Sequence, residues 1–208
     1  MDGDAHLWLG GGIWRGNIVF NPGFEQGFTS WNNPGTAPSN WNDNPTFPFP
    51  HTGTMAANTD CFAGTSCLSG PNAAILYQDL TTVIGDVYVL SVWSVTTNDG
   101  QGNATPNELW GMLGGNLVLD VVNQPGDSVY RQYFSFAFTA TDTTTRLQFS
   151  AYDVPANDFI DDVCVDLNGA DCGTATVAPE PTSWALVSVA LLALVTARRM
   201  RLIPDKTS

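Results

Sequence analysis

The sequence predicts an all-β protein, an antiparallel jelly-roll β-sandwich followed by a linker and one C-terminal hydrophobic helix. Three observations lead to this fold class. About eight short runs of β-forming residues alternate with turn clusters, no run in the body has the apolar period of an amphipathic helix, and one uncharged stretch lies close to the C-terminus. Glycine, proline, asparagine and threonine are abundant and lysine is nearly absent, which favours strands and turns over helices.

The expected strands follow one another along residues 17–167. The strongest signal lies at 87–95, where both faces of an extended chain are largely apolar, so we expect a central strand. Residues 109–123 predict a hairpin that turns at Gly114-Gly115, whereas the Pro/Asn/Gly-rich residues 32–53 predict a long surface loop. The remaining strands are expected at residues 17–20, 72–80, 130–141, 144–154 and 159–167.

The length of 208 residues suits one domain with a hydrophobic core and some appendages. The opening MDGDAHLWLGGGIWRGN has two acids where a signal peptide carries positive charge, so we expect the true start to lie upstream. The alternative is that the protein is not exported. The expected division is a disordered or truncated N-terminus at 1–16, a β-sandwich domain at 17–172, a linker at 173–183, a transmembrane helix with its arginines at 184–201 and a tail at 202–208.

The charge of the chain is strongly negative, with a formal net charge of −13. Nineteen of the twenty acids precede residue 182, together with only three arginines, Arg15, Arg131 and Arg146. Such a surface repels phosphate backbones, so nucleic acid is excluded as a partner. Cations and neutral sugars remain as ligand classes.

The four cysteines form two close pairs in the sequence, Cys61 with Cys67 and Cys164 with Cys172. Gaps of six and eight residues, in glycine-rich loops and beside strand-like runs, are typical of local disulfides. The alternative is one zinc ion held by four thiolates, although neither pair has C-x-x-C spacing and no histidine lies near. Two disulfides indicate an oxidising compartment outside the cytoplasm.

The C-terminal stretch PEPTSWALVSVALLALVTARRMR joins an uncharged run to a cluster of arginines. As a helix, residues 184–197 span about 21 Å, which is short of a hydrocarbon core of about 30 Å. Residues 181–183 and snorkelling arginines narrow the gap, and the arginines keep their end on the cytoplasmic side, with the acidic body outside. The alternative is a buried C-terminal helix of a soluble domain, but such a helix keeps a polar face.

This arrangement resembles the PEP-CTERM sorting signal of exported proteins in exopolysaccharide-producing Gram-negative bacteria. The resemblance covers about the last thirty residues, and the extra LIPDKTS beyond the arginines departs from it. It implies a transient anchor in the inner membrane and recognition by an exosortase, a membrane cysteine protease that cuts near the triplet and passes the body to the cell surface or biofilm matrix. The matching residues are Pro179, Glu180 and Pro181 for the triplet, and Arg198, Arg199 and Arg201 for the basic cluster.

The body carries a second resemblance. NIVFNPGFEQGFTSW, YVLSVWSVTTNDGQGNATPNELWGMLGGN and FIDDVCVD are similar to the opening, middle and end of galactose-binding, carbohydrate-binding β-sandwich modules. The resemblance covers residues 17–168 and implies that the first and last strands lie close together. It also implies one structural Ca²⁺, for which Glu25 and either Asp161 or Asp162 supply carboxylates. Strand alternation allows only one of the two adjacent aspartates to face a given site, and the alternative is that all three acids are solvated.

A sugar site combines aromatic faces with amides and carboxylates that bond hydroxyl groups. The expected platform is Trp41 with Trp31, flanked by Asn42 and Asp43 in the long polar loop. The alternative for Trp31 is packing into the core as part of the opening motif.

Catalysis is not expected, because the only histidines are His6 and His51 and no hydrolase motif is present. The sequence therefore predicts an exported, non-catalytic protein that associates with extracellular polysaccharide. The alternatives are an inert matrix spacer and a cryptic glycan hydrolase.

Overall fold

The computed structural model describes residues 16–34, 41–44, 50–59, 70–71, 74–99, 101–102, 106–154 and 156–172, all within the first of two units of the chain, Met1–Thr174. Every regular element in these ranges is a β-strand. The strands are β1 (Glu25–Phe28), β2 (Trp41–Asn44), β3 (Ala56–Thr59), β4 (Leu76–Thr81), β5 (Val87–Thr96), β6 (Asn107–Leu113), β7 (Asn116–Val122), β8 (Arg131–Phe134), β9 (Phe138–Thr139), β10 (Thr144–Asp153) and β11 (Asp158–Leu167).

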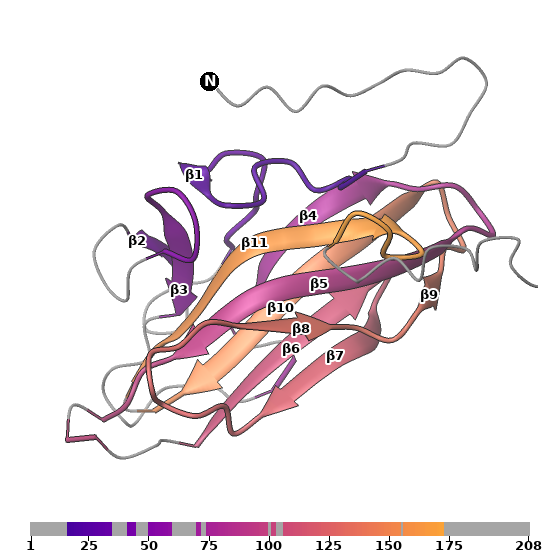
Figure 1. Ribbon diagram of the computed structural model, residues 1–208. Helices are drawn as coiled ribbons and strands as arrows, with labels where there is room; N and C mark the ends of the chain where they lie inside the picture. The colour runs from indigo at the N-terminus through magenta and orange to yellow at the C-terminus, as the bar shows by residue number, and fades with distance from the viewer. Residues whose placement is uncertain are drawn as a thin grey trace, which may run out of the picture. The chain divides into compact units, whose positions relative to one another are not determined.

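The strands form two antiparallel sheets that lie as two layers (Figure 1). The four-stranded sheet has the order β4-β10-β6-β7, and the six-stranded sheet has the order β2-β3-β11-β5-β8, with β9 also paired to β5. Consecutive strands β10 and β11 belong to different sheets, so their short connection crosses from one layer to the other. The prediction of an all-β antiparallel sandwich is confirmed.

The core lies between the sheets and takes alternate residues from the central strands. Leu90 and Val92 of β5 belong to the same buried apolar cluster as Leu109 of β6 and Phe149 of β10. The layers approach so closely at Gly111 that a Cβ atom there would lie 2.9 Å from the Leu90 side chain. The central position predicted for 87–95 follows from the neighbours of β5, which pairs with β11 on one side and with β8 and β9 on the other.

The hairpin of β6 and β7 turns at the predicted glycines, which have φ values of 57° and 78°. Glycine adopts this left-handed region without a steric penalty. The strand predicted at 130–141 is instead divided into β8 and β9, because the chain bonds to two different strands between them. The amide of Ser135 donates to Leu90 of β5, and the amide of Phe136 donates to Val118 of β7.

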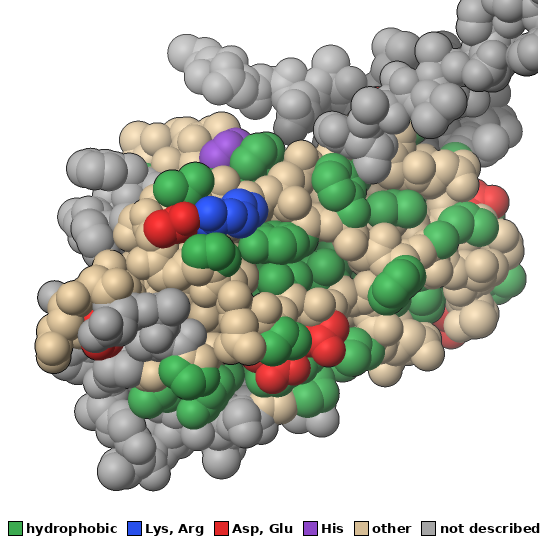
Figure 2. All heavy atoms as spheres, turned by 60° about the horizontal axis from the view of Figure 1, so that its bottom comes forward, with side chains coloured by type: hydrophobic (Ala, Val, Ile, Leu, Met, Phe, Trp, Pro, Cys, Tyr) green, Lys and Arg blue, Asp and Glu red, His purple; other side chains and the backbone are tan. Residues whose placement is uncertain are grey.

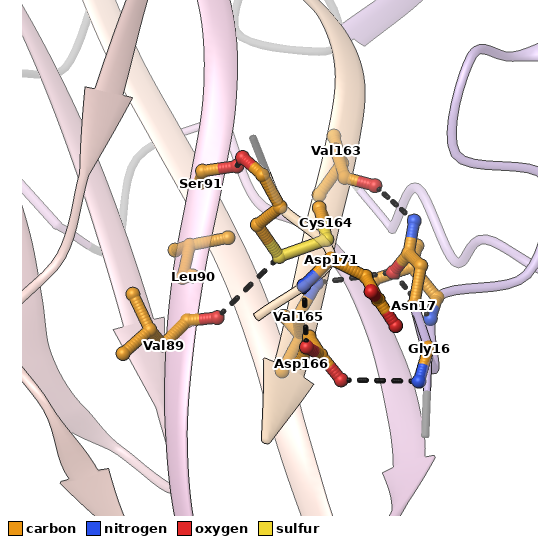
Figure 3. Close-up of a disulfide and its surroundings, with 12 residues drawn as sticks. Gly16, Asn17, Val89, Leu90, Ser91, Val163, Cys164, Val165, Asp166 and Asp171 are labelled. Atoms are coloured by element: carbon orange, nitrogen blue, oxygen red, sulfur yellow. Dashed lines mark hydrogen bonds between the residues drawn. A yellow bond between two sulfur atoms is a disulfide. The ribbon is translucent and has the colours of Figure 1, made fainter. Parts of the chain in front are cut away.

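Two further predictions need correction at the N-terminal side. Residues 32–53 include the strand β2, which pairs with all four residues of β3, so this segment is not only a surface loop. Residues 17–20 form no strand, because the Asn17 side chain takes part in the hydrogen bonds. Its amide donates to the Val163 carbonyl and its oxygen accepts from the Val165 amide (Figure 3). The segment nevertheless runs beside β11, the last strand.

The disulfide between Cys164 and Cys172 is present and closes the end of β11 (Figure 3). The Cys172 carbonyl accepts hydrogen bonds from Ser91 Oγ and Gln132 Nε2, so the closed loop is attached to β5 and β8. This pair is therefore a disulfide and not half of a zinc site. The predicted partners Cys61 and Cys67 lie outside the described residues. In the part of the chain that the structure describes, no helix is long and apolar enough to span a membrane.

Candidate functional site

The sequence-predicted metal ligands Asp161 and Asp162 lie at a β-bulge in β11. The pairing of β11 with β5 shifts between Asp161 and Cys164, and Asp162 has a φ of 44°. A bulge places an extra residue on one strand and so interrupts the alternation of side chains. Both aspartates consequently reach the same loop, whereas strict alternation predicted that only one could face a given site.

That loop, residues 50–55, covers the bulge by donating hydrogen bonds to the carboxylates. The amides of His51 and Thr52 donate to Asp161 Oδ2 at 2.8 and 3.1 Å. Asp162 bonds to the side chains of the same two residues, at 2.6 Å to His51 Nδ1 and 2.7 Å to Thr52 Oγ1. The amide of Asp162 itself donates to Asp161 Oδ1 at 2.7 Å.

The His51 ring also stacks on an aromatic side chain of the sheet. Its centroid lies 3.8 Å from that of Trp93, with 13° between the planes, and 5.4 Å from that of Tyr130. Burial, followed by the charge of Asp162, raises the pKa of Asp161 to about 7. Burial and the charges of both aspartates also raise the pKa of Tyr130. His51 is therefore a packed residue that holds the loop on the sheet.

The third predicted metal ligand, Glu25, points to the next residues of the same loop. Its Oε1 accepts from the amides of Thr54 and Met55, and its Oε2 accepts from Thr54 Oγ1. Loss of solvent at this exposed residue raises its pKa, but the hydrogen bonds from Thr54 and Met55 together outweigh it, so the pKa of Glu25 is lowered.

Whether this site suits Ca²⁺ depends on whether the carboxylate oxygens of Glu25, Asp161 and Asp162 already accept hydrogen bonds. The carboxylates of Glu25 and Asp161 already accept backbone N–H donors, and no three His, Cys, Asp or Glu side chains of the described residues are arranged to hold a metal ion. The arrangement seen is a loop fastened by hydrogen bonds, with all the donors supplied by the protein. The calcium site stays a prediction.

The predicted sugar platform is wrong in its two aromatic residues. Trp41 is 1% exposed and Trp31 is 6% exposed, and both rings belong to the hydrophobic core. The Trp41 ring N–H donates to the Ala74 carbonyl, and the Trp31 ring N–H donates to the Asn21 carbonyl. The physical reason is that β2 pairs with β3 and directs Trp41 inward. The flanking Asn42 is half-buried and Asp43 is exposed. Because both tryptophans are buried, these two polar residues do not flank an exposed ring of Trp31 or Trp41.

A different group of aromatic and acidic residues gathers on the outer face of the four-stranded sheet. Alternation places Leu109 in the core, so Glu108 and Trp110 face outward. The register puts Tyr152 opposite Glu108 and Asp120 opposite Trp110. We call these four residues, Glu108, Trp110, Asp120 and Tyr152, the sheet-face cluster.

The electrostatics of the sheet-face cluster are those of two neighbouring carboxylates. Burial raises the pKa of Glu108. The charge of Asp120 and the hydrogen bond between Glu108 and Asp120 raise this pKa further, whereas a hydrogen bond to the Trp110 side chain lowers it. Tyr152 and Glu108 are half-buried, Asp120 is exposed and Trp110 is buried. The cluster could have been predicted from strand alternation. Each of its residues directly precedes or follows a buried apolar residue in a strand, so it must lie on the opposite face.

The described cations are few and already paired. Arg131 bonds Asp127 at 2.7 Å, and Arg146 bonds Asp79 at 2.7 Å while lying over the Tyr77 ring at 3.8 Å. Figure 2 shows one face on which hydrophobic side chains are scattered among uncharged polar groups and charged side chains are few. In the described part of the body, no free cationic patch is present that would neutralise a phosphate backbone.

The remaining predicted site residues lie outside the described residues. They are the sorting triplet Pro179, Glu180 and Pro181 and the basic cluster Arg198, Arg199 and Arg201, with the helix that joins them.

Comparisons with known proteins show the fold. No protein-family model matches the sequence, and no curated protein matches it. Among solved structures, the chain is similar to TmCBM61 in complex with β-1,4-galactotriose, with a TM-score of 0.54 and 20% identity over 73% of this chain and 98% of that one. It is also similar to the N-terminal CBM22-1-CBM22-2 tandem domain of Paenibacillus barcinonensis Xyn10C, with a TM-score of 0.50 and 12% identity over 74% of this chain and 46% of that one.

A cyclase from Fischerella sp. TAU matches as well, with a TM-score of 0.48 and 14% identity over 72% of this chain and 95% of that one. At such identities the comparisons establish the architecture alone. The body of this protein has the two-sheet β-sandwich fold that is found in carbohydrate-binding modules.

Proposed function

We propose that this protein is an exported, non-catalytic carbohydrate-binding protein that associates with extracellular polysaccharide through the outer face of its four-stranded sheet. The observation that carries the proposal is the sheet-face cluster, in which the half-buried Tyr152 ring shares one face with the carboxylates of Glu108 and Asp120, beside the buried Trp110. Aromatic faces pack against the C–H groups of a sugar, and carboxylates accept hydrogen bonds from its hydroxyl groups. TmCBM61, which shares the fold, is bound to a galactotriose.

The geometry of the carboxylates supports binding over hydrolysis. Glycosidases need two carboxyl groups about 5 to 10 Å apart, on either side of the bond that is cleaved. Glu108 and Asp120 are instead direct neighbours whose hydrogen bond raises the pKa of Glu108, an arrangement unlike a pair placed on either side of a glycosidic bond. Their shared negative charge also suits a neutral glycan better than an anionic one.

The export part of the proposal rests on two features, the disulfide of the body and the C-terminal motif. The Cys164–Cys172 disulfide is typical of oxidising compartments outside the cytoplasm. The C-terminal motif resembles that of an exosortase substrate, which implies a transient anchor in the inner membrane before transfer to the cell surface or matrix. Mass spectrometry of the mature C-terminus tests this part, since an untrimmed chain in the cytosol with reduced thiols contradicts it.

Retention in affinity gels that contain β-1,4-galactan, xylan or the source organism's exopolysaccharide tests the binding part. Asp120→Asn and Tyr152→Ala each remove one group of the cluster, and we expect retention to fall several-fold on the glycan that slows the wild type. Phe136→Ala is the matched control, because Phe136 is 82% exposed and lies outside the cluster. If Asp120→Asn and Tyr152→Ala are retained as strongly as Phe136→Ala, the sheet-face cluster does not bind the glycan.

The second candidate function is an inert matrix spacer with the same fold. It is favoured by the burial of Trp31, Trp41 and Trp110 and by the ring of His51 that covers Trp93. A wild-type chain that no glycan retards in the gels supports the spacer and contradicts carbohydrate binding.

A further inference from the structure

One end of the space between the two sheets is polar. Toward the middle of this space, the inward-facing residues are apolar, for example Leu90 of β5 and Ile160 of β11. Further along the same strands, the inward-facing positions are filled by short polar side chains that are almost completely buried. These positions are Ser94 and Thr96 of β5, Asn107 of β6, Asp153 of β10 and Asp158 of β11.

Part of this polar end has its hydrogen bonds satisfied. Asn107 and Gln124 bond each other twice, through the Asn107 amide group to the Gln124 carbonyl at 2.9 Å and the Gln124 backbone amide to Asn107 Oδ1 at 2.7 Å. The Gln124 side chain also donates to Ser94 Oγ at 3.2 Å. Buried polar groups in folded proteins are normally paired in this way.

Asp158, at the same end, is not explained by such pairing. Asp153 ends β10 and Asp158 begins β11, so the four-residue connection between the sheets brings both acids to one place. Both side chains are 0% exposed. Burial, followed by the charge of Asp153, raises the pKa of Asp158 well above its ordinary value. The arginines of the described residues, Arg131 and Arg146, are paired with other acids.

Three oxygen atoms beside these acids have no hydrogen-bond partner. They are both carboxylate oxygens of Asp158 and the hydroxyl oxygen of Thr96. Thr96 is the cross-strand partner of Asp158, so its side chain shares the inward face, and it is 1% exposed. The Thr96 hydroxyl is near enough to oppose the rise in the pKa of Asp158, but it meets hydrogen-bond geometry with no group. A buried carboxylate without a donor is unfavourable, which indicates that something binds there.

We propose that Asp153, Asp158 and Thr96 bind a calcium ion between the sheets, separate from the acids of the β11 bulge. The candidate ligands are all oxygen atoms, which hard divalent cations prefer, and Ca²⁺ accepts irregular sites with carboxylates and hydroxyl groups. Mg²⁺ demands a near-ideal octahedron and keeps several waters, which fits a closed inter-sheet space less well. Zn²⁺ is disfavoured, because no histidine or thiolate is among these residues. No described trio of His, Cys, Asp or Glu is present here, so the third protein ligand is the hydroxyl.

The ion would fasten the two sheets at the point where β10 passes into β11. The rival explanation is that the two carboxyl groups share one proton, as close carboxylate pairs do. The two explanations differ in what calcium does to stability, since only a bound ion makes the melting temperature depend on calcium concentration.

The test uses the full chain freed of metal with EDTA, with CaCl₂ titrated by isothermal calorimetry and thermal unfolding followed in parallel. We expect the wild type to melt at a higher temperature as calcium is added, and Asp158→Asn to lose this response with a Kd raised about 100-fold. In EDTA, Asp158→Asn should melt at or above the wild-type temperature, because the amide is uncharged and so avoids the unfavourable burial of a carboxylate beside Asp153. Thr96→Val, which removes the hydroxyl without changing charge, should raise the Kd about tenfold.

Glu25→Gln is the matched control, because it changes an acid of the other predicted calcium site, and it should keep the calcium response. A wild type that does not respond to 10 mM calcium overturns the proposal and favours the shared proton. A response that disappears in Glu25→Gln and persists in Asp158→Asn overturns it as well, and assigns the ion to the β11 bulge. If Asp158→Asn does not fold, Thr96→Val gives the same decision.

Discussion

Replacing Trp41 with alanine distinguishes a core residue from a sugar platform. The Trp41 side chain is 1% exposed, and its ring N–H bonds the Ala74 carbonyl. Trp→Ala changes in cores cost about 3 to 5 kcal/mol, and a carbonyl left without its donor adds about 1 kcal/mol. A domain of this size has a free energy of unfolding of about 5 to 15 kcal/mol. Trp41→Ala should therefore remove a large share of the stability and lower the melting temperature by roughly 10 °C or more.

The assay is urea unfolding followed by circular dichroism, beside gel retention on whichever polysaccharide slows the wild type. Phe136→Ala is the control for loss of an exposed aromatic ring, since a surface change of this kind stays within about 0.5 kcal/mol. Trp41→Phe keeps part of the buried area and should lie between the two. If Trp41→Ala unfolds within about 1 kcal/mol of the wild type and yet loses retention, the ring binds sugar and the core assignment is refuted.

Two more results follow from the acids and the disulfide. Because burial raises the pKa of Asp161 to about 7 in the folded state, the contribution of this group to stability in EDTA should be greatest below its ordinary pKa of 3.8 and fall as the pH rises to 7, by up to about 4 kcal/mol. Asp161→Asn should flatten this fall, and parallel pH curves for the two proteins would contradict the assignment. Opening the Cys164–Cys172 loop, whose cysteines are 8 residues apart, should cost about 2 to 3 kcal/mol by chain entropy, measured as the urea midpoint of a double serine variant. An unchanged midpoint would show that the loop is held by Cys172's hydrogen bonds to β5 and β8.

Much of the fold could be predicted from local pattern. The runs that became β5, β6, β7, β10 and β11 alternate or are apolar on both faces, and glycines mark the turn between β6 and β7. The strands β2 and β3 were missed because their residues, WNDN and AANT, carry little β signal of their own. They become strands by pairing with each other and with β11, which is a long-range event.

The site predictions show the same division. Cys164 and Cys172 could be paired because they are close in sequence, so their contact hardly depends on the rest of the fold. Trp41 could not be placed, because its polar neighbours in sequence say nothing about the direction in which β2 points it. The approach of Asp161 and Asp162 to a single loop depends on a β-bulge, and the local sequence contains no signal that predicts it.

By its own composition and periodicity, the sequence determined that this chain is an acidic, antiparallel β-protein with a local disulfide and few basic residues before residue 182. Only the tertiary structure decided which aromatic rings are covered, which acids meet across the sheets and which face carries Glu108 and Asp120 together. The reason is that alternation along a strand needs only neighbours in the chain. The register between strands and the layer that covers each face depend on contacts between residues that are far apart in it.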